Sequence, residues 1–478
     1  MREHDAVIIG GGISGLAIAH ALSRAGLSVE LWEGSSRVGG KIQSSRQNGY
    51  TLDSAASMVM NFRSEVDEFI DDAGLTPHKL MRRPGDRRYV VNAGRLTEVP
   101  TGMAALLKSP MLSTAGKLRL LAEPLVARGT NPHESVADFV SRRLGPECVK
   151  KFFDPYIAGP LASDVDRAEA AATMPRLVAL EKRYGSLGLG ALLKKCLHRG
   201  SAARPQVFTF HGGMETLVDH LASHGGFTVR RQLRATEIWP VAGGWRVRGH
   251  SGGQDRTVFT RQLVLSTPAA AAANLLREQD AELAHLLGGI EYAPIRVVHT
   301  GFERIRVQHP LDGSGFLLPG QSGFEVNGCL WIGSLFPDHA PTDRVLLTSY
   351  LGGARNPAAI DWSEQRCLDA VMPMLRDLLG THGDPEMVRI ESHRQGLPLY
   401  HGNYSARLGG INERLRKLPG LHLEANYRGG VSVRDRILCA QSLARRVLRQ
   451  RKAETRSAPI RAGGAILAGV APASGVLR

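Results

Sequence analysis

The chain is poor in cysteine and contains no long hydrophobic run. Five cysteines are spread over 478 residues and no two form a CxxC pair, so a disulfide framework or a metal site is not expected and a reducing compartment is favoured. No apolar segment of about 20 residues is available to cross a bilayer. A strand is predicted so close to Met1 that no room is left for a secretory signal. We expect a cytoplasmic protein, with peripheral contact to the inner face of the cell membrane left open.

Interleaved basic and aromatic residues, which mark many nucleic-acid surfaces, are also missing, so no nucleic-acid partner is expected. The formal net charge is nonetheless +15, from 60 Lys and Arg against 45 Asp and Glu. This surplus favours acidic partners, for example anionic lipid or an anionic small substrate. The 43% hydrophobic content is ordinary for a folded protein, and the length predicts two or three domains.

The N-terminal segment predicts a dinucleotide-binding βαβ unit. The compact apolar run Ala6–Ile9 is typical of a buried parallel strand. A G-x-G-x-x-G motif follows it and leads into a helical stretch, Leu16–Ala25. A second strand, Ser28–Trp32, ends at Glu33, the acidic residue expected about 20 positions after the motif.

Each residue of this motif has a physical role in holding a dinucleotide. Gly10 permits the tight turn, Gly12 lets the backbone approach a pyrophosphate, and Gly15 lets the helix pack closely on the strand. The helix start offers free N–H groups and a positive dipole end to the phosphates. Glu33 is placed to accept hydrogen bonds from the ribose hydroxyls. The predicted contacts at the helix start are Ile13 and Ser14.

A second glycine turn follows directly and favours FAD over NAD. It contains Arg37, Gly39, Gly40 and Lys41 in an E-x-x-x-R-x-G-G-[KR] pattern, with Arg37 able to meet a phosphate. The pattern resembles the flavin-dependent amine oxidase and protoporphyrinogen oxidase superfamily. A basic surface loop with incidental glycines is the alternative.

A C-terminal run, Asn426–Val433, makes the resemblance more specific. It is similar to the flavin motif of the oxygen-dependent protoporphyrinogen oxidases, as are the stretches Met174–Leu177, Phe210–Met214 and Leu397–Tyr400. The resemblance covers the chain to about residue 450. It implies that Val431 lies at the flavin ring and that the helix starting at Val433 assists its pyrimidine carbonyl. With these two residues, the cofactor contacts that the resemblance implies are Ala55, Ala235, Asn426, Gly430, Val431, Ser432 and Val433.

Three segments depart from the family pattern. Ala55 and Ser163 stand where glycine is common, and Glu424-Ala425 replaces Ala-Gly. Alanine costs little where φ is negative, but a carboxylate at Glu424 would be repelled by FAD phosphates unless it points away or meets an arginine. Altered flavin affinity, a different substrate or a non-catalytic relative are therefore left open.

The resemblance implies an α/β fold: a Rossmann-like FAD-binding domain of the amine oxidase type, a mostly antiparallel β-sheet substrate domain and a helical insertion. The FAD-binding domain is predicted to comprise residues 1–78, 205–275 and 396–452. The substrate domain comprises residues 79–100 and 276–395. The helical insertion spans residues 101–204, and residues 453–478 form a loose tail.

The activity implied is oxidation of protoporphyrinogen or coproporphyrinogen, in haem biosynthesis, in three two-electron steps with O2 giving H2O2. Arg88 matches the arginine that the family places against a propionate, and arginine suits carboxylates by its bidentate geometry. Phe316 and Leu330 are candidate pocket walls, with plain core residues as the alternative. Tyr400 is expected near the flavin, although an aromatic ring packed under a loop is the commoner reason for such a residue.

Other readings remain open at this point. A flavin desaturase or amine oxidase acting on an isoprenoid or an amine is the enzymatic alternative. Apolar and basic residues alternate over Met103–Leu121, as in a helix that lies on an anionic bilayer; an ordinary lid domain is the alternative there. A homodimer is neither required nor excluded.

Overall fold

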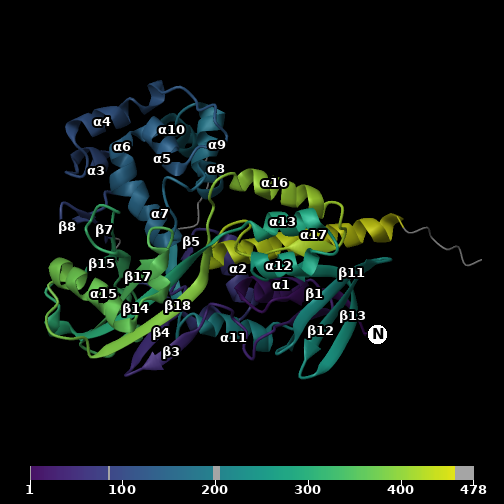
Figure 1. Ribbon diagram of the computed structural model, residues 1–478. Coiled ribbons are helices and arrows are strands. Elements are labelled where there is room, and N and C mark those ends of the chain that lie inside the picture. Colours follow the sequence, from purple (N-terminus) through teal and green to yellow (C-terminus); the bar gives the residue numbers. More distant parts are fainter. Residues whose placement is uncertain (1, 84–86, 198–204, 458–478) are drawn as a thin grey trace, which may run out of the picture.

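The computed structural model describes residues 2–83, 87–197 and 205–457 and arranges them in three parts (Figure 1). A first sheet has the strand order β10-β2-β1-β13-β12-β11, and β19 also pairs with β13. Its central strands run parallel and are apolar because helices cover both faces. The parallel strands are β1 (Arg2–Ile9), β2 (Val29–Trp32), β10 (Thr228–Arg230), β13 (Gln254–Leu265) and β19 (Leu421–Leu423). The antiparallel strands are β11 (Arg234–Val241) and β12 (Gly244–Ser251).

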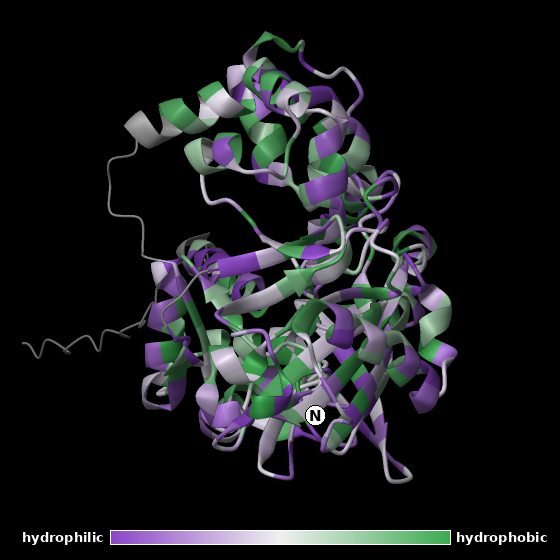
Figure 2. Ribbon diagram, turned by 90° about the vertical axis from the view of Figure 1, so that its left-hand side faces the viewer, coloured by the Kyte–Doolittle hydropathy of each residue, from purple (hydrophilic) through white to green (hydrophobic). Residues whose placement is uncertain are grey.

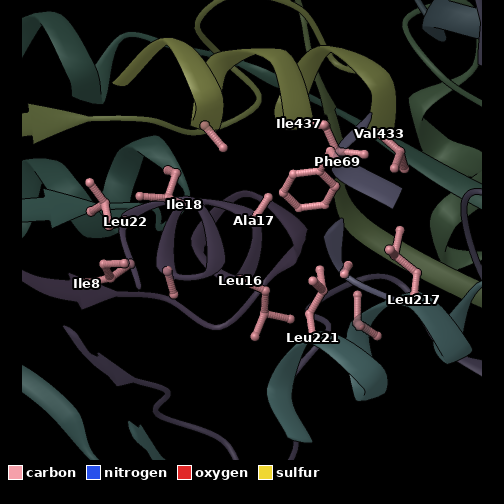
Figure 3. Packing of buried hydrophobic residues seen from close by; sticks show 14 of the residues in the cluster. Ile8, Leu16, Ala17, Ile18, Leu22, Phe69, Leu217, Leu221, Val433 and Ile437 are labelled. Atoms are coloured by element: carbon pink, nitrogen blue, oxygen red, sulfur yellow. The ribbon is translucent and has the colours of Figure 1, made fainter. Parts of the chain in front are cut away.

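Helix α1 (Ile13–Arg24) lies at the centre of the first hydrophobic core. Figure 3 shows Leu16 and Ala17 of α1 among Phe69, Leu217 and Ile437, which come from three other helices. These are α2 (Ser64–Asp72), α11 (Glu215–His224) and α17 (Val433–Ser457). The opposite face of the sheet is covered by α12 (Ala269–Leu276), α13 (Ala281–Gly288) and α16 (Tyr404–Leu415). This layered α/β part confirms the predicted fold class.

A second sheet has the order β18-β14-β17-β16-β15-β7-β8 and is antiparallel except between β15 and β7. Helix α15 (Glu364–Leu379) packs on one face, where Phe302 and Met374 belong to its core cluster. The other face is turned toward the strands β3 (Ser44–Gln47) and β4 (Tyr50–Asp53) of the first part, since Tyr50 and Leu52 pack with Leu346. The strands are β7 (Arg87–Asn92), β8 (Arg95–Glu98), β14 (Tyr292–Glu303), β15 (Gly313–Leu317), β16 (Val326–Leu330), β17 (Arg344–Gly352) and β18 (Met387–Pro398).

The helical part projects above both sheets and has a core of its own (Figures 1 and 2). Ser113 and Ser135 cap helices α4 and α5 with their hydroxyls, as expected of serine at an N-cap. Arg143 and Glu123 form a fully enclosed ion pair in its centre. The helices are α3 (Met103–Lys108), α4 (Thr114–Leu121), α5 (Val136–Leu144), α6 (Pro146–Cys148), α7 (Asp154–Leu161), α8 (Ala170–Thr173), α9 (Pro175–Tyr184) and α10 (Leu187–Leu197), with the short 3₁₀ turn η2 (Glu123–Leu125).

Two boundaries differ from the sequence-based prediction. Strand β6 (Lys79–Met81) pairs with β9 (Gln206–Phe210), which also pairs with β5 (Val59–Asn61), and not with the sheet that holds β7 and β8. Its three residues therefore belong with the first part rather than with the substrate domain. Helix α17 continues to Ser457, so the predicted loose tail does not begin at residue 453; residues 458–478 lie outside those described. No helix in the described ranges combines the length and apolarity needed to cross a membrane.

Candidate cofactor site

The three glycines of the first loop differ in why they lack a side chain. Gly10 has φ +108°, and a Cβ there would lie 2.9 Å from the carbonyl oxygen of Ser266. A Cβ on Gly15 would lie 1.9 Å from the carbonyl oxygen of Gly10, so these two glycines are required by the chain's own backbone. A Cβ on Gly12 would meet nothing within 4 Å. The open space above Gly12 fits a group that must approach the backbone closely, such as a pyrophosphate.

The N-terminus of α1 opens into this space. Gly12 is its N-cap, with φ −72° and ψ 176°, and no acidic residue lies in its first turn. The free N–H groups and the dipole of a 12-residue helix are therefore unopposed. Ile13 and Ser14 stand in this first turn, and their contact with phosphates stays a prediction.

Glu33 lies beside the same loop, at the end of β2. Its Oε2 accepts a hydrogen bond of 2.8 Å from the Gly11 amide, and its Oε1 accepts one of 2.7 Å from the Ser35 amide. The Leu233 amide donates to the Glu33 carbonyl at 2.9 Å, which brings the start of β11 and Ala235 close to the end of β2. A bulge between Ala235 and Glu237 interrupts β11 at this point.

The second glycine turn is attached to the first. The Gly39 amide donates to the carbonyl of Gly11 at 2.7 Å, and a Cβ on Gly40 would lie 3.3 Å from the Cα of Gly12. Arg37 donates to the carbonyls of Val38, Ile42 and Gly40 at 3.1, 3.2 and 2.7 Å. The guanidinium therefore braces its own turn, and its contact with a phosphate stays a prediction.

Lys41 follows this turn and contacts no carboxylate among the described residues. Burial lowers the pKa of its ammonium to about 8. The ammonium lies 5.8 Å from the ring centroid of Tyr292, the first residue of β14. Lys41 is thus an available cation at the junction of the two sheets.

The C-terminal loop reaches the same edge of the first sheet. Strands β1, β13 and β19 are parallel, with Ile9 opposite Leu265 and Leu265 opposite Leu423. Ligands bind beyond the carboxyl ends of such strands. The loop from Glu424 then turns at Gly430 with φ +106°, where a Cβ would lie 2.5 Å from a carboxylate oxygen of Asp435.

The start of α17 closes this loop. The Ser432 hydroxyl accepts a hydrogen bond of 3.2 Å from the Asp435 amide, so α17 begins at Val433 with a serine at its N-terminus. Asn426 is fixed through its carbonyl, which accepts a bond of 3.2 Å from the Tyr400 hydroxyl. Val431 lies between the glycine turn and the helix, half-buried.

The departures from the family pattern are accommodated. Glu424 meets Arg446 of α17, with Oε1 3.0 Å from Nη2, which is one of the two conditions that its carboxylate requires. Ala55 does not have a positive φ, so its Cβ causes no backbone strain. Ser163 pairs with His401 at 2.9 Å, and the left-handed conformation belongs to the neighbouring Ala162 with φ +50°.

The predicted substrate residues are distributed over the second sheet. Phe316 is 2% exposed and packs with Trp331 in the core beneath α15, so it offers no surface to a ligand. Its neighbour Leu317 faces α7, since a Cβ on Gly159 would lie 2.4 Å from it. Leu330 is half-buried on the face that packs against β4. Arg88 is exposed on β7 and forms no ion pair with any described residue.

Asp53 is a residue that the sequence analysis did not select. Its Oδ1 accepts hydrogen bonds from the Met214 amide at 2.9 Å and the Ser44 hydroxyl at 2.6 Å. Asp53 therefore joins the turn before Ala55 to the Phe210–Met214 stretch. The sequence showed a family resemblance in each segment but did not show that the two segments are in contact. The contact of Tyr292 with Lys41 was likewise not visible in any sequence pattern.

Comparison with known proteins agrees with this geometry. Residues 13–422 match the family model of flavin-containing amine oxidoreductases. The mitochondrial protoporphyrinogen oxidase of Nicotiana tabacum is 31% identical over 89% of this chain and 91% of its own length. The coproporphyrinogen III oxidase of Bacillus subtilis is 28% identical over 90% of this chain and 94% of its own length.

Solved structures show the same fold. A protein from Exiguobacterium, provisionally assigned as a protoporphyrinogen oxidase, has a TM-score of 0.77 at 22% identity and covers 94% of this chain and 99% of its own. A variant of putrescine oxidase has a TM-score of 0.68 at 16% identity with the same coverage. The open space at Gly12, the unopposed α1 terminus and the free Lys41 fit an FAD molecule, and FAD is the cofactor of this enzyme. The chain belongs to the flavin-containing amine oxidoreductase family, among relatives that include the protoporphyrinogen oxidases.

Proposed function

We propose that the chain is an FAD-dependent porphyrinogen oxidase of haem biosynthesis, which oxidises protoporphyrinogen or coproporphyrinogen in three two-electron steps with O2 giving H2O2. The observation that carries the proposal is the likeness to oxidases of both substrates over about nine-tenths of the chain. The first glycine loop, the second glycine turn and the C-terminal loop also support it, because together they fit a flavin cofactor.

The bound flavin would supply the redox chemistry by accepting a hydride at its ring. The chain's own residues bind and orient. Gly12, Ile13 and Ser14 would hold the pyrophosphate at the α1 terminus, and Glu33 would accept the ribose hydroxyls. The segment from Gly430 to Val433 would face the isoalloxazine ring.

Substrate binding would use the face of the second sheet that is turned toward β4. Leu330 offers apolar surface on this face, and Leu317 offers apolar surface toward α7. Arg88, with no carboxylate partner among the described residues, would pair with a propionate. Phe316 contributes only by supporting the sheet from its core. Tyr400 would hold the C-terminal loop through its bond to Asn426.

The first test is the identity of the bound flavin, followed by an assay in air-saturated buffer with porphyrinogens that were prepared without oxygen. Purified protein should be yellow and release FAD on heating. Protoporphyrinogen and coproporphyrinogen are tested separately, and at least one of them should give the fluorescent porphyrin. One equivalent of peroxide should accompany each two-electron step. A protein that binds FAD but oxidises neither macrocycle would overturn the proposal.

The alternative of a non-catalytic relative loses its main support. It was motivated by Ala55, Glu424 and Ala425, but neither alanine has a positive φ and Glu424 is paired with Arg446. The likeness to amine oxidases is a likeness of fold at 16% identity and favours no amine substrate.

We further propose that the helical part makes peripheral contact with an anionic bilayer. Six leucines on three neighbouring elements, α4, η2 and α10, are exposed, and Leu125 is 89% exposed. Lys182 and Arg183 lie in the last turn of the adjacent α9 and are also exposed. An apolar surface bordered by cations suits such a bilayer. The leucines are Leu118, Leu121, Leu125, Leu189, Leu192 and Leu193.

Sedimentation with vesicles tests this contact. The protein should co-sediment with vesicles of phosphatidylglycerol and phosphatidylcholine, and the double variant Leu125→Glu/Leu192→Glu should not. Ile305→Glu is the matched control, since Ile305 is 82% exposed but lies in the substrate part. Equal sedimentation of the double variant and the control would refute the contact.

A further inference from the structure

Arg436 is a buried cation in the first turn of α17. Its side chain is 2% exposed. The guanidinium donates to the carbonyls of Ala425 at 2.6 Å and Arg428 at 2.5 Å, and lies 3.4 Å from the sulfur of Cys439. Its Nε has no hydrogen-bond partner, and no carboxylate of the described residues forms an ion pair with it.

This position is unfavourable for a positive charge in two ways. Buried charges are normally paired, because removing an ion from water is costly. Cations are also disfavoured at helix N-termini, where the helix dipole is already positive. Arg434, in the same turn, pairs with Asp435 at 2.8 Å, so the charge of Arg436 remains uncompensated. A neutral side chain of similar length would avoid both costs.

The location of Arg436 beside the loop between β19 and α17 indicates a role for its charge. The carbonyls that Arg436 holds belong to the loop between β19 and α17, directly before the segment Gly430–Val433. A Cβ on Gly429 would lie 3.2 Å from the Nη2 of Arg436. The unpaired cation and the positive end of α17 therefore act on the same small region, which we propose to face the flavin ring.

We propose that Arg436 stabilises the reduced form of the bound FAD. When the neutral oxidised ring takes two electrons from the substrate and one proton, it gains one negative charge. A fixed cation that is screened from water favours this charged form over the oxidised one. Arg436 contacts only the loop, so it is a positioning residue that acts through its charge. The inference depends on the proposed place of the flavin ring.

The test compares Arg436→Met with Arg445→Met. Both remove one arginine charge from α17, but Arg445 is exposed. The reduction potential of bound FAD, measured by equilibration with a reference dye, should fall by at least about 30 mV in Arg436→Met, which is a tenfold weaker relative binding of reduced FAD. Arg445→Met should keep the wild-type potential. A wild-type potential in Arg436→Met overturns the inference.

Arg436→Lys separates the effect of the charge from the effect of loop geometry. It also provides a test of the inference if the Met variant fails to fold. The lysine keeps the charge and loses part of the hydrogen bonding, so we expect a lower melting temperature with a nearly unchanged potential. A fall of about 30 mV or more in this variant would overturn the inference. Wild-type protein that binds no FAD would refute the proposed function itself, whereas FAD binding with equal potentials in all variants refutes only the role of Arg436.

Discussion

Replacing Gly12 by valine tests the cofactor site without a large effect on the fold. The backbone at Gly12 has φ −72° and ψ 176°, a conformation that valine adopts without strain. The new Cβ would meet no protein atom within 4 Å. The only structural loss is that valine is a poorer N-cap than glycine, which costs about 1 kcal/mol or less. The apoprotein should therefore fold and melt close to the wild-type temperature.

FAD binding should respond very differently. The valine side chain fills the space through which a pyrophosphate would reach the N–H groups of α1. Losing close approach at a site of this kind should weaken binding by at least about 100-fold, which corresponds to about 2.7 kcal/mol. The effect on binding therefore exceeds the effect on folding by about twofold or more.

The assay is titration of apoprotein with FAD, followed by flavin fluorescence, together with thermal unfolding of each apoprotein. Gly288→Val is the matched control, because a Cβ on Gly288 also meets nothing within 4 Å. Gly288 is the last residue of α13 and is far in sequence from the first glycine loop. A Gly12→Val protein that folds and binds FAD like the control would show that the open space is not the phosphate site. The assignment of the first glycine loop would then be wrong.

Three further predictions follow from the same geometry. Gly15→Ala should severely destabilise the apoprotein in thermal unfolding, because its Cβ would lie 1.9 Å from a backbone oxygen; a wild-type melting curve would contradict the close packing of α1 on β1. FAD affinity should fall as the pH rises through about 8, because the pKa of Lys41 is lowered to about 8 and its ammonium loses the charge that attracts the phosphates; in Lys41→Met the titration should be flat with pH. Phe316→Ala should lower the free energy of unfolding in urea by about 3–5 kcal/mol as a core truncation, whereas Leu317→Ala, on the opposite face of β15, should cost less and instead raise the substrate KM.

The cofactor loops were predictable because their physical requirements are local. A strand, a glycine turn and a helix follow one another within the first part of the chain, and Gly10, Gly12 and Gly15 occupy the positions that such a turn demands. The glycine pattern alone did not distinguish their roles. Only the folded backbone shows that Gly15 is excluded from having a side chain by Gly10, whereas Gly12 is kept open.

The second sheet was predicted as a class but not residue by residue. Successive side chains on a strand point to opposite faces, so a difference of one position decides between core and pocket. Phe316 and Leu317 are adjacent and equally apolar in pattern, and the structure assigns the first to the α15 core and the second toward α7. Strand β6 shows a similar limit, because pairing with β9 depends on a partner about 130 residues away.

Long-range compensation explains why departures from a family pattern are tolerated. Glu424 is read from the sequence as a carboxylate in a phosphate-binding region, yet the group that neutralises it, Arg446, lies about four turns into the next helix. Arg436 presents the opposite case, since its nearest neighbours are carbonyls that leave its charge intact. Between Glu424 and Arg436 both carboxylates, Glu424 and Asp435, are paired with an arginine. Arg428 and Arg436 have no carboxylate partner among the described residues. The net result is a positive potential at the start of α17, which is the sign that an anionic cofactor and its reduced ring require. That balance is set by side chains brought together only in the folded chain, and it is the property that the potential measurements on Arg436 would detect.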